Sequence, residues 1–160
     1  MLTKNFYIHL AATFTGQAAT FKNGYGQTYT DSQASWSSAR FSLSYINTMT
    51  KAPTSNGVVF GDGDKAPTED DYWLSGNIIT TLSGSGTVRK TKDDAGMTVT
   101  SSFLLTNSGT SDVTIKEVGY CSAYNSGALL DRTVLDEPLT IPAGGIGQVT
   151  YTIRMNYPTA

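Results

Sequence analysis

The sequence predicts an all-β protein built as a β-sandwich, and three observations favour that fold class. Residues 148–157 alternate apolar and polar side chains without interruption, which is a strong signal for a strand with one buried face. The chain holds 24 threonines and 16 serines but only three glutamates, a composition that suits strands and turns better than helix interiors. Shorter alternating runs, separated by turn residues at a spacing typical of sandwiches, fill residues 88–157.

The N-terminal part, residues 1–56, is expected to form extra strands or an arm that docks on the sandwich or completes a sheet. Residues 5–12 alternate large apolar side chains with others, so we predict a first strand with His9 on its outer face. The pair Asn23-Gly24 predicts a hairpin returning over residues 28–30, because both residues adopt positive φ at little cost. The remaining predicted elements are a loop over 31–39, a strand over 41–46 and a polar connector over 51–56.

The sandwich core is expected over residues 57–160, although residues 1–160 can also be read as one continuous domain. Residues 57–61 form a short apolar run bounded by glycines, which predicts a buried strand. Thr68 followed by three acidic residues is typical of a helix N-cap with a negatively charged first turn. We therefore predict a one-turn helix there, held against the core by Tyr72, Trp73 or Leu74.

The C-terminal half predicts a series of strands joined by turns. Residues 88–92 and 97–106 flank a predicted turn over 93–96 and predict a hairpin. Residues 107–112 are turn formers throughout. The segments that follow are predicted strands over 129–135 and 139–142, a turn over 143–145 and the final strand over 148–157.

A change of parity in the strand near residue 116 predicts a β-bulge. Val113 and Ile115 would share one face of this strand, whereas Val118 and Tyr120 would lie on the opposite face. A bulge near Lys116-Glu117 brings all four apolar side chains to the same side, because one extra residue reverses the alternation.

Charge and cysteine usage exclude several classes of partner. The formal net charge is −2 and the chain has no run of Lys or Arg, so we expect neither nucleic acid nor an anionic membrane as a partner. No segment approaches the roughly 18 apolar residues of a membrane span, and residues 1–14 lack a signal-peptide pattern, which indicates synthesis in the cytoplasm. The single cysteine, Cys121, excludes an internal disulfide and is expected to be buried as a small hydrophobe.

The sequence contains no residues that we assign to catalysis, to a cofactor or to a metal. Because His9 is the only histidine, a Ser-His-Asp or Cys-His site would have to use it, and the chain lacks a Gly-x-Ser-x-Gly elbow. One Cys and one His also cannot supply a Cys/His metal site. An acidic stretch can be read as a Ca²⁺ loop or as a solvated turn, and we favour the turn because the spacing does not fit an EF-hand. Its members are Asp62, Asp64, Glu69, Asp70 and Asp71.

Two further sets of residues have both a structural and a functional interpretation. Glu117 and Arg132 lie in facing predicted strands, where a cross-strand ion pair is a structural feature and implies no reaction. Four aromatic residues could stack on sugar rings, but aromatic side chains in β proteins more often belong to the core or to subunit contacts. These aromatic residues are Tyr25, Tyr29, Trp36 and Trp73.

Several segments together resemble a known group of proteins. A glycine-bounded strand at 58–64 is followed by Pro67-Thr68 and by the acidic turn Asp70-Asp71-Tyr72. Later segments of the same pattern include Glu117-Val118-Gly119, Leu130-Asp131-Arg132 and, at the end, 139–145. Over residues 57–157 the chain resembles small structural proteins encoded in the virion modules of tailed bacteriophages and prophages.

The resemblance implies a non-enzymatic virion subunit with an immunoglobulin-like or jelly-roll-like sandwich, placed in the head as a decoration protein of the capsid, or in the neck, tail or fibre attachment. It implies contacts with other virion proteins and with further copies of the chain in a symmetric homo-oligomer. It carries over no catalytic residue and no cofactor. The alternative interpretation is a carbohydrate- or receptor-binding module on a phage fibre or a cell surface.

Overall fold

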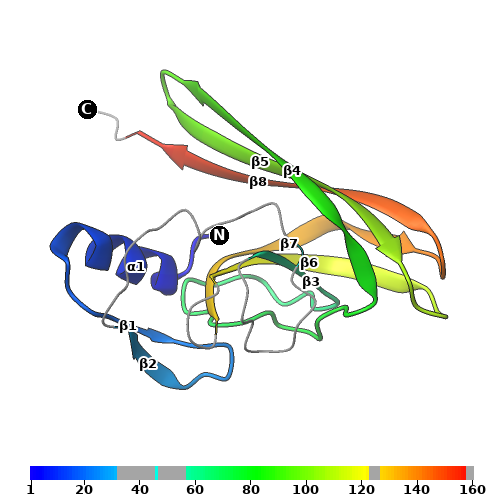
Figure 1. Ribbon diagram of the computed structural model, residues 1–160, viewed down its shortest axis with the longest axis horizontal. Helices are drawn as coiled ribbons and strands as arrows, with labels where there is room; N and C mark the ends of the chain where they lie inside the picture. Colours follow the sequence, from blue (N-terminus) through cyan, green and yellow to red (C-terminus); the bar gives the residue numbers. More distant parts are fainter. Residues whose placement is uncertain (32–45, 47–56, 123–126, 158–160) are drawn as a thin grey trace.

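The computed structural model describes residues 1–31, 46, 57–122 and 127–157, and its fold is all-β apart from one helix (Figure 1). The strands form a two-stranded hairpin and two three-stranded antiparallel sheets, with orders β3-β6-β7 and β4-β5-β8. The elements are α1 (Lys4–Thr15), β1 (Ala19–Lys22), β2 (Thr28–Asp31), β3 (Gly57–Gly61), β4 (Leu82–Asp93), β5 (Gly96–Asn107), β6 (Val113–Ser122), β7 (Ala128–Ile141) and β8 (Ile146–Asn156).

The main hydrophobic core lies between the two three-stranded sheets. Phe60 on β3 meets Phe103 on β5 edge to face, with ring centroids 5.7 Å apart. The alternation of β8 is confirmed, because Val149 and Tyr151 are buried while the residues between and beside them are exposed. The β4–β5 hairpin is also confirmed, although β4 begins at Leu82, earlier than predicted.

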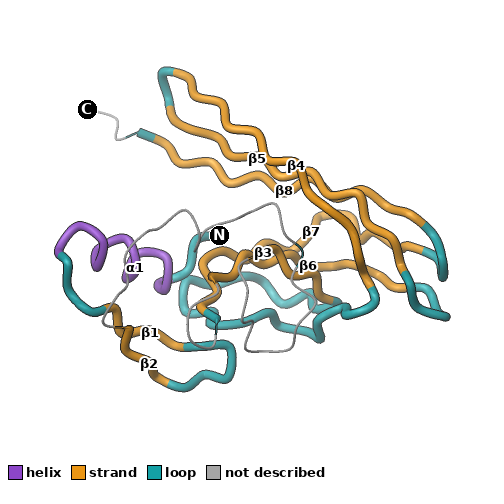
Figure 2. Tube along the Cα trace, viewed as in Figure 1, coloured by secondary structure: helices purple, strands orange, loops and turns teal. Residues whose placement is uncertain are grey.

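A third layer covers the other face of the β3-β6-β7 sheet. The connection over residues 62–81 runs along that side of the sheet, away from β4-β5-β8 (Figure 2). It contributes Trp73 and Leu74 to a second apolar cluster that also contains Val59 and Cys121. Strand β3 is therefore buried on both faces, as its unbroken apolar run predicted, and Cys121 is buried as expected.

The predicted first strand over residues 5–12 is wrong, since these residues lie within helix α1. The short alternating run also fits a helical face, because Asn5, His9 and Ala12 recur at helical spacing and are the buried residues of α1. His9 is accordingly buried and not on the outer face of a strand. Gly16 ends the helix in the left-handed region, at φ 64°. No helix in the described part of the chain is long and apolar enough to cross a membrane.

The hairpin predicted from Asn23-Gly24 is confirmed, but its turn is longer than a two-residue turn. Strands β1 and β2 pair from Ala19 to Asp31, and the turn spans residues 23–27. The Asn23 side chain closes the turn, because its Oδ1 accepts hydrogen bonds from the backbone N–H groups of Tyr25 and Gln27, both at 3.0 Å. The predicted loop over 31–39 lies outside the described residues except for Asp31, which belongs to strand β2. The connector over 51–56 lies outside them too, as does the predicted strand 41–46 except for its last residue.

The predicted bulge near Lys116-Glu117 is confirmed by a shift of register between β6 and β7. Ile115 pairs with Leu139 and Glu117 pairs with Val134, so residues 135–138 of β7 lie opposite Lys116 alone. The extra residues are therefore on β7, which continues through the irregularity as one strand where two were predicted. With this shift of register, Ile115, Val118 and Tyr120 all belong to the main core cluster.

The core interpretation predicts a large effect for Phe103 and a small one for its neighbour. Phe103→Ala removes a fully buried ring at the contact between the sheets, so we expect the free energy of unfolding to fall by about 3–5 kcal/mol. Leu104→Ala is the matched control, because Leu104 is 59% exposed on the outer face, and it is expected to change stability by less than about 0.5 kcal/mol. Urea denaturation followed by circular dichroism measures both values; similar losses would contradict this placement of the core.

Candidate functional site

The most elaborate polar site of the described residues surrounds the buried guanidinium of Arg132. Its Nε donates to Oε2 of Glu117 at 2.7 Å, and a terminal nitrogen donates to Oδ2 of Asp71, also at 2.7 Å. The other terminal nitrogen donates to the backbone oxygen of Lys65 at 2.6 Å. Arg132 and Glu117 are both fully buried, so the predicted cross-strand pair between β7 and β6 is confirmed.

Glu117 connects this pair to two separate parts, or arms, of the 62–81 connection, one at residue 63 and the other at residues 75–76. Its Oε1 accepts hydrogen bonds from the backbone N–H groups of Gly76, at 2.7 Å, and Gly63, at 3.2 Å. Its Oε2 accepts from the backbone N–H of Ser75 at 3.0 Å and from the Ser75 hydroxyl at 3.2 Å. A Cβ atom at Gly63 would lie 2.4 Å from Oε1, so only glycine permits this close approach.

Residues 68–71 form a turn, and the predicted one-turn helix is wrong. The Thr68 hydroxyl does not accept a hydrogen bond from a backbone N–H group of the described residues, as the side chain of a helix N-cap would. Thr68 donates instead, through its backbone N–H and its hydroxyl, to the Asp71 carboxylate at 2.9 and 3.0 Å. Asp71 is held in this position by Arg132, so a contact from a distant strand replaces the helix that the local sequence favours.

The acidic stretch does not gather its carboxylates around one point. Asp64 pairs with Lys116, and Asp62 accepts a hydrogen bond from the backbone N–H of Asn77. Glu69 and Asp70 both pair with Lys4 of helix α1, at 3.3 and 2.6 Å. Within the described residues, no group of three or more His, Cys, Asp or Glu side chains is arranged to hold a metal ion.

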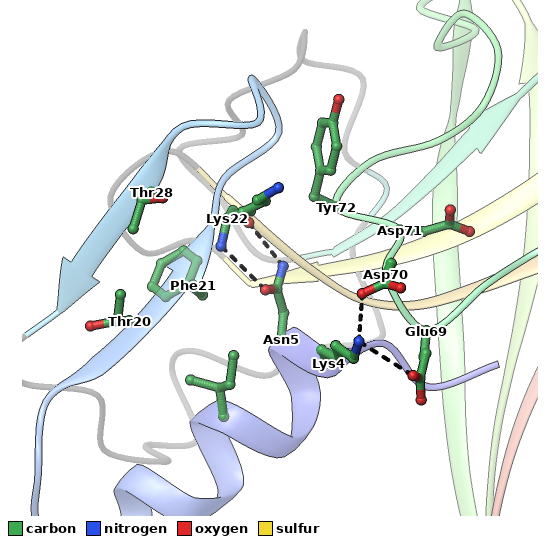
Figure 3. Close-up of a pocket in the computed structure, with 11 residues that line it drawn as sticks. Lys4, Asn5, Thr20, Phe21, Lys22, Thr28, Glu69, Asp70, Asp71 and Tyr72 are labelled. Carbon is green, nitrogen blue, oxygen red and sulfur yellow. Dashed lines mark hydrogen bonds and ion pairs between the residues drawn. The ribbon is translucent and has the colours of Figure 1, made fainter.

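A hollow of about 390 Å³ lies between α1, β1 and the acidic stretch (Figure 3). The Lys4 ammonium closes one side through its two ion pairs, and Asn5 is hydrogen-bonded to the backbone of Lys22. The Asp71 carboxylate points away from this hollow, toward Arg132 (Figure 3). Asp70, Asp71 and Tyr72 also line a second hollow, of about 400 Å³.

The four aromatic residues considered for sugar stacking do not form one platform. Trp73 is buried, and Tyr29 packs against Phe21 with ring centroids 5.6 Å apart. Tyr25 is 56% exposed, and Trp36 lies outside the described residues. Tyr72, which does not belong to this set, is 40% exposed and lines both hollows.

The reactive side chains of the described residues are placed in apolar or internally bonded surroundings. Nδ1 of His9 lies 2.7 Å from the backbone oxygen of Asn5, and its ring packs against Phe21. Burial raises the pKa of the Cys121 thiol, so the thiol stays protonated at neutral pH and is a poor nucleophile. Neither side chain takes part in the Arg132 network.

Electrostatics keep the Arg132 network charged. Partial burial acts to raise the pKa of Asp71, but hydrogen bonds from Thr68 and Arg132 outweigh it and hold this pKa below its usual value of 3.8. Burial would also lower the pKa of Arg132, and the hydrogen bonds to Asp71 and Glu117 reverse that effect. The network thus binds its own charges to one another and holds a loop on a sheet.

Comparison with protein families, with curated proteins and with solved structures finds no match to this chain.

Removing the cation from this network should destabilise the protein strongly. Arg132→Met leaves the fully buried carboxylate of Glu117 without its counter-charge, so we expect unfolding to become easier by about 3–5 kcal/mol. Arg154→Met is the matched control, because Arg154 forms an exposed ion pair with Asp93, and a much smaller loss is expected. Comparable urea midpoints for the two variants would show that the buried network does not stabilise the fold.

The lowered pKa of Asp71 predicts a defined pH dependence. Near neutral pH Asp71 is ionised in both folded and unfolded chains; as the pH falls below about 4, the unfolded chain takes up the proton first and becomes relatively more stable. Stability from Asp71 is therefore present above its unfolded pKa and lost as the pH falls through the folded pKa. We expect the difference in unfolding free energy between wild type and Asp71→Asn to narrow between pH 7 and pH 2 in urea titrations. A difference that stays constant across this range would contradict the assignment.

Proposed function

We propose that this protein is a non-enzymatic structural subunit of a tailed-bacteriophage particle that acts through protein–protein contacts. The proposal rests on the resemblance of residues 57–157 to small virion proteins and on the role that the resembling segments have in this fold. Head decoration, neck, tail and fibre attachment all remain within the proposal, and the subunit would occur in several copies in the virion.

One observation carries the proposal: one charged residue from each of three resembling segments meets the others in a single network around the buried Arg132. The Asp-Asp-Tyr turn supplies Asp71, the Glu-Val-Gly segment supplies Glu117, and the Leu-Asp-Arg segment supplies Arg132. Their hydrogen-bonding capacity is used to fasten a loop to a sheet. Polar residues that fasten a loop to a sheet stabilise a scaffold, and a structural subunit of a particle requires such a scaffold.

The outer face of the β4-β5-β8 sheet also suits contact with neighbouring subunits. Its exposed hydroxyl groups pair across the strands, as between Thr100 and Thr152 and between Ser102 and Thr150. Leu104 and Ile146 lie on the same face and are 59% and 66% exposed. A face with few charges and some exposed apolar side chains loses little solvation when another protein covers it.

A second candidate function is glycan binding at the hollows beside Tyr72. Tyr72 is exposed and lines both hollows, and the walls carry the Asn5 amide and the Glu69 and Asp70 carboxylates, which could bind sugar hydroxyls. Binding on a glycan array that is lost in Tyr72→Ala would favour this function over the first.

The proposed function predicts that the protein is present in particles. Particles should be purified from a host carrying the phage or prophage that encodes this chain, and their proteins measured by quantitative mass spectrometry. We expect the chain at a stoichiometry of several copies per particle, together with the major virion proteins. Its abundance in the lysate combined with its absence from purified particles would contradict the proposal.

A further inference from the structure

We infer that strand β4 is a docking edge for a second copy of this chain, whose acidic bulge on β7 lies along it in a head-to-tail contact. The inference rests on the proposed function, because it names the partner through which copies of the subunit would join. It follows from a strand edge that no described strand pairs with, and from a separation of surface charges that form no ion pair within the described residues.

Strand β4 is exposed to an unusual extent. Its only partner strand within the described residues is β5. All of its residues from Ser83 to Asp93 are exposed except Gly86, which is half-buried. An edge strand of this length presents alternate backbone N–H and C=O groups to the outside, where another extended segment can pair with them.

The cations on β4 have no ion-pair partners within the described residues. Lys90 and Lys92 lie on the face of β4 that carries the buried Leu82, and Arg89 lies on the opposite face. Three other surface cations, Lys4, Lys116 and Arg154, do form ion pairs with carboxylates. Like charges repel, so two β4 edges would not pair with each other, whereas an acidic segment would be attracted.

The matching anions are in the irregular part of β7. Asp136 and Glu137 belong to the four residues that lie opposite Lys116 alone, and both are exposed and without an ion pair in the described structure. Successive residues of an extended segment point to opposite sides. An Asp-Glu pair lying along β4 would therefore place one carboxylate near Arg89 and the other near Lys90.

The two surfaces are different, so a single contact between them is heterologous, as the proposed head-to-tail arrangement requires. Strand β4 belongs to one sheet and β7 to the other, and no ion pair joins them within a single copy. A contact between unlike surfaces leaves one of each free at the ends of a dimer, and further copies can add to form a ring or a row.

Reciprocal charge reversal tests this inference. We expect wild type to self-associate in sedimentation equilibrium at low salt, and to do so less at high salt. The variants Arg89→Glu/Lys90→Glu/Lys92→Glu and Asp136→Lys/Glu137→Lys should each associate more than about tenfold more weakly. A mixture of the two should form a 1:1 complex, because the native β4 of one variant meets the native β7 bulge of the other and the two reversed surfaces also attract each other. Lys65→Glu, at an exposed cation outside both surfaces, is the control and should behave as wild type.

Each remaining outcome overturns the inference. A monomeric wild type at all concentrations and salts excludes the contact, while the proposed function stands or falls separately on the composition of purified particles. Self-association that survives both charge reversals, or a mixture that fails to form the 1:1 complex, shows that copies meet through other surfaces. All of the changed side chains are exposed, and far-ultraviolet circular dichroism verifies that the variants fold.

Discussion

The structure depends on one buried cation and the two carboxylates that surround it. A guanidinium removed from water is tolerated only where its charge is balanced and its N–H groups are hydrogen-bonded, and Arg132 meets both conditions through Asp71, Glu117 and the backbone of Lys65. Glu117 in turn binds backbone N–H groups from both arms of the 62–81 connection. The network thereby joins the central sheet to the layer that covers it, and fixes a long stretch that contains no strand or helix of its own.

The parts of the fold that the sequence predicted are those governed by local alternation. Strand β8 and the β4–β5 hairpin were predicted because each has one buried face, and the bulge at Lys116 because the parity of the apolar residues changes. Helix α1 was missed because its apolar run is too short to distinguish a period of two from a helical period. The turn at Asp71 was missed because it depends on Arg132, 61 residues away in the chain.

The same distinction applies to the candidate site. Pairing of Glu117 with Arg132 could be predicted because adjacent strands place them side by side. The glycines at 63 and 76 gave no sign of their role, since Gly63 lies against the Glu117 carboxylate of β6 and Gly76 lies against Asp62 and the backbone of Gly63. A scaffold held internally in this way leaves its exposed edges, and above all β4, as the part of the molecule available to other proteins. Under the proposed function, this open edge is where the subunit would contact other proteins.

The most direct test of this account is native-state hydrogen exchange at the backbone N–H groups that Glu117 binds. If the buried network locks the loop to the sheet, the amides of Gly63, Ser75 and Gly76 should exchange only through global unfolding, with the same free energy as core amides of β5. Exchange of these amides as fast as that of unstructured peptide, while β5 stays protected, would show that the loop opens independently and would contradict the account.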